Sequence, residues 1–322
     1  MIRSSKLIWF FLKFAITALL IIYVSQQLEW KVVKIQFYNA EYGYLIIGFI
    51  LITLRTILVS HRIQYLLREQ HIYIDYRDLL RHYFIGYFFG IMIPGRIGGD
   101  LIRGFYLSRH NVSVKKAAAA LIVERVLGLL SLTTLPVFII FINSDHLRYD
   151  IIKWGVLLCL LLSFIIICLF IPKGQQLALN VMKLLGALKY DKVEKFILSF
   201  GCYTFNKMSV IYALILSYIF NIIGIFSIYL YGLGLKLELS FSHHLLYMPL
   251  VWVVNTLPLT IGGFGIREEA MLNLYALAGL GIDQEGGIVG LMSLSTLGTI
   301  LIGYIVWVKS KRSFDLSGTE SN

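Results

Sequence analysis

Charged residues are scarce in this chain: they make up 15% of its 322 residues, whereas about a quarter are charged in an ordinary soluble domain. This shortage excludes a water-soluble enzyme. Five prolines and 27 glycines are too few for a collagenous or disordered chain. Three cysteines without a C-x-x-C pair cannot form a disulfide framework and indicate neither a zinc site nor a redox pair. We therefore expect no metal and no cofactor.

Hydrophobic residues, in contrast, make up 58% of the chain and gather in long runs between charges. A bilayer core about 30 Å thick requires roughly 20 apolar residues per helix. The runs predict an all-α, polytopic membrane protein with about six transmembrane helices, at residues 7–25, 43–60, 117–142, 151–171, 209–233 and 286–308. The net charge of +11 then indicates a membrane surface and not a nucleic acid partner.

Lysine and arginine are distributed unevenly between the two sides of these spans. With the N-terminus inside, 20 of them fall in cytoplasmic segments and six outside. The positive-inside rule therefore predicts a cell-membrane protein with cytoplasmic N- and C-termini. The longest cytoplasmic connection, residues 173–207, alternates apolar residues with lysines, which suits either an amphipathic helix on the inner leaflet or a solvated linker.

Two further apolar stretches, residues 79–110 and 243–280, are interrupted by proline and glycine and are too short to cross singly. We read both as re-entrant helical hairpins. Residues 94–103 (PGRIGGDLIR) and 258–267 (PLTIGGFGIR) are identical at six of ten positions. The neighbouring spans repeat at a similar offset, which predicts an inverted repeat with halves at about 43–142 and 209–308 within a single domain, 1–322.

The repeated tips carry groups that bind anions. Paired glycines let backbone N–H groups approach a ligand, a following helix adds a positive dipole end, and arginine binds two phosphate oxygens at once. This predicts a phosphate-binding site. Its residues are Arg96, Gly98, Gly99, Arg103, Gly262, Gly263 and Arg267. The alternatives are close helix packing for the glycines and positive-inside anchoring for Arg96 and Arg103.

Charges inside an apolar chain are usually paired or functional. Four of them, Asp100, Glu124, Arg125 and Glu268, are candidates for counter-charges to the arginines or for proton coupling. For Glu124 and Arg125, a purely structural ion pair is an equal alternative.

The paired glycine motifs, together with Glu124-Arg125 at the start of a span, resemble the membrane region of lysylphosphatidylglycerol synthases and its stand-alone, flippase-like relatives. The resemblance covers nearly the whole chain and places Arg96, Asp100, Arg103, Glu124, Arg125, Arg267 and Glu268 at matching motif positions. It implies movement of a lipid between leaflets, aminoacylated phospholipid or a polyprenyl-linked or hopanoid lipid in different members. Those synthases continue into a soluble aminoacyltransferase domain, whereas this sequence ends at Asn322, so we expect no lysyl transfer.

The leading hypothesis is a non-enzymatic flippase that translocates an anionic phospholipid or polyprenyl phosphate, without an ATP-binding motif. A lipid-modifying synthase is a possible partner, and the sequence does not indicate the oligomeric state. A membrane-embedded lipid-phosphate transferase is the main alternative, with Asp75 and Asp78 as conceivable metal ligands. Transport of a small soluble anion, or a role as accessory subunit of a lipid-modifying enzyme, are further alternatives.

Overall fold

Helices account for all the regular structure that is described. The computed structural model describes residues 2–92, 97–110, 112–142, 149–184, 207–257 and 259–317. Within these ranges there are twelve α-helices and no strand, so the all-helical class is confirmed. The helices are α1 (Ile2–Gln27), α2 (Trp30–Tyr38), α3 (Tyr42–Glu69), α4 (Tyr76–Met92), α5 (Ile97–Ser108), α6 (Val114–Ile142), α7 (Asp150–Leu169), α8 (Pro172–Leu184), α11 (Lys207–Gly234), α12 (Phe241–Val254), α13 (Ile266–Ala276) and α14 (Ile282–Ser317).

Five of these helices, α3, α6, α7, α11 and α14, are long and apolar enough to cross a membrane. They correspond to five of the six predicted spans. The remaining predicted span, 7–25, lies in α1, where Phe14–Gln27 forms a shorter apolar helix. On α7, the side chains of Leu157, Leu161 and Phe164 are 52%, 57% and 67% exposed, as expected of a surface that faces lipid. The chain is therefore a multi-pass membrane protein.

Several helices are longer than the apolar runs that predict them. Helix α3 continues to Glu69, nine residues beyond the predicted end, and α14 continues to Ser317. Charged residues did not end α3, because its buried Arg62 forms an ion pair with another helix. The expectation that Pro249 interrupts the second hairpin was wrong, since α12 passes through it. Pro249 is buried within α12, and the helix continues past the backbone hydrogen bond that proline cannot donate.

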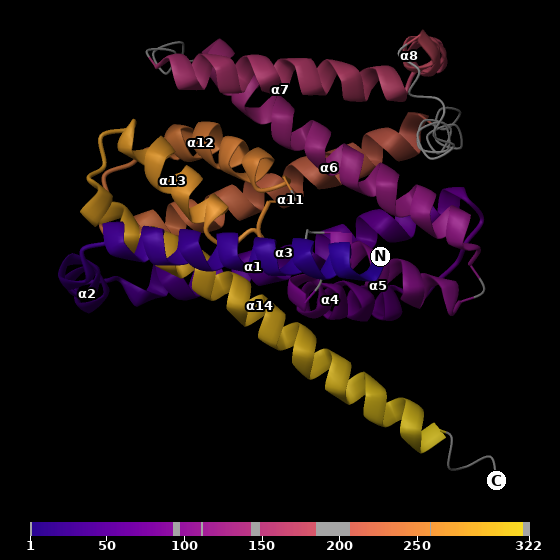
Figure 1. Cartoon of the computed structure of the whole chain (residues 1–322), viewed down its shortest axis with the longest axis horizontal. Helices are drawn as coiled ribbons and strands as arrows, with labels where there is room; N and C mark the ends of the chain where they lie inside the picture. Colours follow the sequence, from indigo (N-terminus) through magenta and orange to yellow (C-terminus); the bar gives the residue numbers. More distant parts are fainter. Residues whose placement is uncertain are drawn as a thin grey trace.

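Two helix pairs occupy the places of the predicted hairpins. Helices α4 and α5 pack against each other, and so do α12 and α13. The first pair also packs on α14 and the second on α6, while α3 and α11 pack against each other in the middle. Figure 1 shows this body, with α7 along one edge and the end of α14 projecting from the opposite edge. Each pair thus packs against the last long helix of the other half.

The predicted cytoplasmic linker, 173–207, is described only at its two ends. Helix α8 follows α7 and packs against it, which makes the first part of the segment helical as the amphipathic interpretation requires. Residues 185–206 lie outside the described residues.

Candidate functional site

A cavity of about 500 Å³ lies between the two helix pairs. The first pair contributes Gly99, Asp100 and Arg103 to its wall, and the second contributes Arg267 together with Gly262 and Phe264 from the turn before α13. Residues 164 positions apart therefore meet at one cavity, because α3 and α11 bring the two halves of the chain together. Five arginines line this cavity: Arg55, Arg62, Arg103, Arg125 and Arg267.

Glu124 on α6 is the centre of a buried polar network in the cavity wall. Its Oε1 accepts a hydrogen bond from Arg62 at 2.5 Å, and its Oε2 accepts one from the Tyr83 hydroxyl at 2.6 Å. Arg103 Nη1 lies 3.8 Å from the same Oε2, and Arg62 also donates to the Ser217 hydroxyl at 2.7 Å. The carboxylate is 4% exposed, so these donors replace the water that burial removes.

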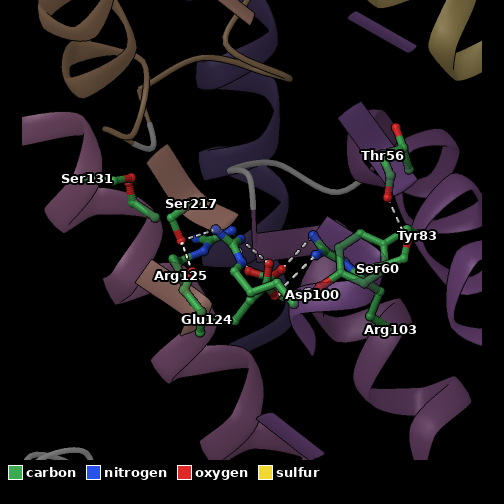
Figure 2. A network of polar contacts seen from close by, with 12 residues as sticks. Thr56, Ser60, Tyr83, Asp100, Arg103, Glu124, Arg125, Ser131 and Ser217 are labelled. Carbon is green, nitrogen blue, oxygen red and sulfur yellow. Dashed lines mark hydrogen bonds and ion pairs between the residues drawn. The ribbon is translucent and has the colours of Figure 1, made fainter. Parts of the chain in front are cut away.

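Asp100 joins two of the arginines (Figure 2). Its carboxylate lies 2.7 Å from Arg103 Nη2 and also forms an ion pair with Arg125. The guanidinium of Arg103 lies over the Tyr83 ring, 4.5 Å from its centroid, and its Nε donates to the carbonyl of Gly99. Arg103 is therefore held in place by two carboxylates, a ring and a carbonyl, and it faces the cavity.

Arg267 is held in a similar way in the second pair. It forms an ion pair with Glu268 and donates to the Thr296 hydroxyl at 2.9 Å. Glu268 in turn accepts from the Gly265 N–H at 2.7 Å and so caps the start of α13. A carboxylate at the N-terminus of a helix is also favoured by the helix dipole.

The two glycine pairs take different conformations. Gly98 and Gly99 lie in the first turn of α5, and a Cβ on Gly99 would be 2.8 Å from the Gly86 carbonyl oxygen of α4. Gly262 and Gly263 form the turn before α13, with φ of +64° and +80°. The first pair thus allows close helix packing, the alternative considered above, whereas the second allows a left-handed backbone.

The predicted site residues that the structure describes lie together at or near this cavity. Arg96, Pro94 and Pro258 lie outside the described residues. Gly98, Gly263 and Glu268 are not among the residues that line the cavity, although Glu268 pairs with Arg267, while the other predicted residues that are described line it. Their role in binding a phosphate stays a prediction.

Sequence reasoning missed Arg55 and Arg62 as residues of this cavity. Neither is among the predicted site residues, since Arg55 lies inside the predicted span 43–60 and Arg62 directly follows that span. Both line the cavity from α3, and Arg62 is 5% exposed. Their spacing of seven residues, two helical turns, was the available signal, because it places both side chains on one face of a helix.

Carboxylates at the proposed metal spacing are engaged elsewhere. Asp78 forms an exposed ion pair with Arg81 at 3.0 Å, in the first turns of α4. Within the described ranges, no three His, Cys, Asp or Glu side chains come close enough together to hold a metal ion. The polar and aromatic groups that line the cavity are guanidinium groups, hydroxyls, the amides of Asn221 and Asn255, the carboxylates of Asp100 and Glu124, and aromatic rings.

Comparison with known proteins gives a consistent result over almost the whole chain. The family model of the lysylphosphatidylglycerol synthase TM region matches residues 10–303. A UPF0104 membrane protein of Archaeoglobus fulgidus is 26% identical, with 92% of this chain and 95% of the relative covered. Two UPF0104 membrane proteins of Methanocaldococcus jannaschii are 22% and 25% identical, covering 88% and 70% of this chain and 90% and 95% of the relatives. No solved structure matches the chain.

Proposed function

Since the chain belongs to the family of the lysylphosphatidylglycerol synthase TM region, we propose that it translocates an anionic, phosphate-bearing lipid between the leaflets of the membrane and is not itself an enzyme. The substrate is an anionic phospholipid or a polyprenyl phosphate, and its acyl or prenyl chains stay in the bilayer while the headgroup passes through the cavity. A separate lipid-modifying synthase would supply or consume the lipid.

The observation that carries this proposal is the shared cavity. Arg103 of the first helix pair and Arg267 of the second occupy equivalent positions in the sequence repeat, and both line it. A headgroup bound there could be contacted by both halves of the chain, as in transporters whose site lies at a repeat interface.

The packing pattern supports an inverted repeat. Helices α4 and α12 are equivalent in the repeat, as are α6 and α14 and as are α3 and α11. The contact of α4 with α14 then corresponds to that of α12 with α6, and α3 packs on α11, its own equivalent. A two-fold relation between the halves produces such reciprocal contacts. We propose that the axis lies in the membrane plane, that both termini are cytoplasmic and that the helix pairs enter as re-entrant hairpins from opposite faces.

The ion pairs of the cavity suggest how a headgroup is received and released. Without ligand, Asp100 neutralises Arg103 and Glu268 neutralises Arg267. A phosphate that enters takes over donors from these carboxylates, because a guanidinium binds phosphate and carboxylate with the same forked geometry. Exchange of partners keeps the arginines satisfied in both states, so that neither the empty nor the occupied cavity leaves them without a counter-charge.

Reconstitution into liposomes tests the proposal. Purified protein should transfer fluorescent phosphatidylglycerol, or a fluorescent polyprenyl phosphate, between leaflets faster than empty liposomes do. Arg103→Gln and Arg267→Gln should each slow transfer by about tenfold or more, since each removes charge-assisted hydrogen bonds worth about 1.5–3 kcal/mol.

Arg81→Gln is the matched control, because Arg81 is an exposed arginine of α4. This variant should transfer lipid at the wild-type rate. Wild-type transfer by both cavity variants would contradict the assignment of the site, and absence of transfer for every anionic lipid would contradict the proposed function. Product formation from a donor and a lipid by the purified protein alone would instead indicate a transferase.

A further inference from the structure

Arg55 differs from the other four arginines of the cavity. Arg62 pairs with Glu124, Arg103 and Arg125 pair with Asp100, and Arg267 pairs with Glu268. For Arg55, the part of the chain that is described provides no ion pair, and Arg267 lines the same cavity. It is also close to the middle of the 28-residue helix α3, where a charge in a membrane span is most costly.

The position of Arg55 is nevertheless well defined. Its guanidinium lies over the Phe220 ring at 4.5 Å and over the Trp252 ring at 5.5 Å, so α11 and α12 both provide aromatic faces. Gly224 of α11 leaves the space for it, since a Cβ there would be 2.1 Å from Arg55 Nη1. The faces of the rings attract the guanidinium cation, but its N–H groups point outward in the plane of the guanidinium and stay available to bind a ligand. The charge is therefore held at the cavity without being neutralised.

The charges of the cavity indicate which anion this arrangement fits. Five arginines line it, whereas the carboxylates that pair with them are Asp100, Glu124 and Glu268. Among the described residues, Arg55 is thus the arginine of the cavity whose charge no carboxylate of the wall offsets. A phosphomonoester carries about −1.5 to −2 at pH 7, because its second ionisation has a pKa of about 6. A phosphodiester headgroup such as that of phosphatidylglycerol carries −1, and zwitterionic or aminoacylated headgroups carry no excess negative charge.

We infer that the cavity selects a phosphomonoester dianion and that Arg55 is the residue that recognises its second negative charge. The inference rests on the proposed function for the lipid source of that headgroup. Arg103 and Arg267 would share the remaining phosphate oxygens, whereas Arg62 stays with Glu124 in the wall.

Competitive binding of two lipids with the same acyl chains tests the inference. The full-length protein in detergent micelles is titrated with phosphatidic acid, a phosphomonoester, and with phosphatidylglycerol, a phosphodiester. The wild type should bind phosphatidic acid about tenfold more tightly, which corresponds to about 1.4 kcal/mol. Arg55→Gln should lose this preference but still bind phosphatidylglycerol, and Arg81→Gln should keep it.

A second measurement does not depend on the folding of a variant. At pH 5 phosphatidic acid carries about one negative charge. The ratio of the wild-type affinities for phosphatidic acid and phosphatidylglycerol should therefore fall toward one, because the charge of phosphatidylglycerol stays the same.

Arg55→Lys gives a conservative variant for comparison. It keeps the positive charge and should keep part of the preference for phosphatidic acid, but not all of it, because lysine lacks the planar fork of arginine.

The outcomes separate the inference from the proposed function. Equal binding of both lipids by the wild type, or an unchanged preference in Arg55→Gln, overturns the inference and leaves anionic lipid transport standing. Binding of neither lipid overturns both. Soluble glycerol 3-phosphate distinguishes the sources of the anion: if it binds as tightly as phosphatidic acid, the dianion site is supported and the lipid substrate is overturned.

Discussion

At the scale of single residues, the cavity wall contains four arginines that pair with carboxylates. Glu124 illustrates the physical requirement, because each of its oxygens accepts a hydrogen bond from a buried donor, Arg62 or Tyr83. A buried ion pair contributes little compared with an apolar pair, but removing one partner leaves the other charge buried without compensation. The network is therefore sensitive to the loss of a single charge.

Glu124→Gln should consequently destabilise the protein. Arg62, which is 5% exposed, would lose its carboxylate partner and become a buried charge without compensation. This predicts a loss of about 3–5 kcal/mol of folding stability. Thermal unfolding of the purified protein in detergent measures the effect. Asp150→Asn is the control, because Asp150 pairs with Lys153 at an exposed position at the start of α7, and its melting temperature should fall much less. Equal melting temperatures for both variants would contradict a structural role of Glu124.

At the scale of elements, the turn between α12 and α13 depends on glycine. Gly262, Gly263 and Gly265 all have positive φ, and only the turn that they form lets α13 start beside the cavity. The corresponding glycines of the first pair are helical and lie against Gly86. The Gly-Gly dipeptide therefore has a different role in each motif: it permits a left-handed backbone before α13 and close helix packing between α4 and α5.

Gly263→Ala should disturb this turn more than a positive φ alone explains. A Cβ at Gly263 would be 1.8 Å from Asn255 Oδ1, and left-handed backbone costs about 1–2 kcal/mol for other residues. Gly279 is the matched control, since its φ is +90° but no atom lies within 4 Å of a Cβ there. Thermal unfolding and lipid transfer should both be affected more strongly by Gly263→Ala than by Gly279→Ala. Equal effects of the two substitutions would mean that backbone strain, and not the contact with Asn255, accounts for the destabilisation.

At the scale of the whole molecule, the transport proposal depends on the orientation of the chain. The charge distribution predicts that α2 lies outside and that the connection between α3 and α4 lies inside. Lys34 of α2 and Tyr73 of that connection are both exposed. They are therefore suitable positions for labelling.

In a background with the three native cysteines replaced by serine, Lys34→Cys should react with a membrane-impermeant maleimide in intact cells. Tyr73→Cys should react only after permeabilisation. Reaction of both in intact cells would place the two connections on one side of the membrane. Helix α3 would then not span the membrane, and the predicted orientation, in which α3 and its equivalent α11 both cross, would be wrong.

Local composition was sufficient to predict the class of protein and most of its elements. Apolar runs between charges predicted about six membrane spans, and five of them are long apolar helices, because burial in lipid requires length and hydrophobicity that any one segment shows by itself. The repeated motif also identified Arg103 and Arg267, which the structure brings to one cavity. Helix ends were less predictable: α3 runs past Arg62 because a distant residue neutralises that charge.

The sequence by itself therefore determined a helical membrane chain with a repeated glycine motif, since hydrophobic length and repeated motifs are local properties. Tertiary structure alone decided which charges meet. Arg62 and Glu124 are 62 positions apart, and the rings of Phe220 and Trp252 come to Arg55 from helices in the other half of the chain. The packing of α3 against α11, and the position of Trp252 on α12, place aromatic rings beside Arg55 where the described residues provide no carboxylate, because electrostatic compensation depends on distance in space and not along the chain.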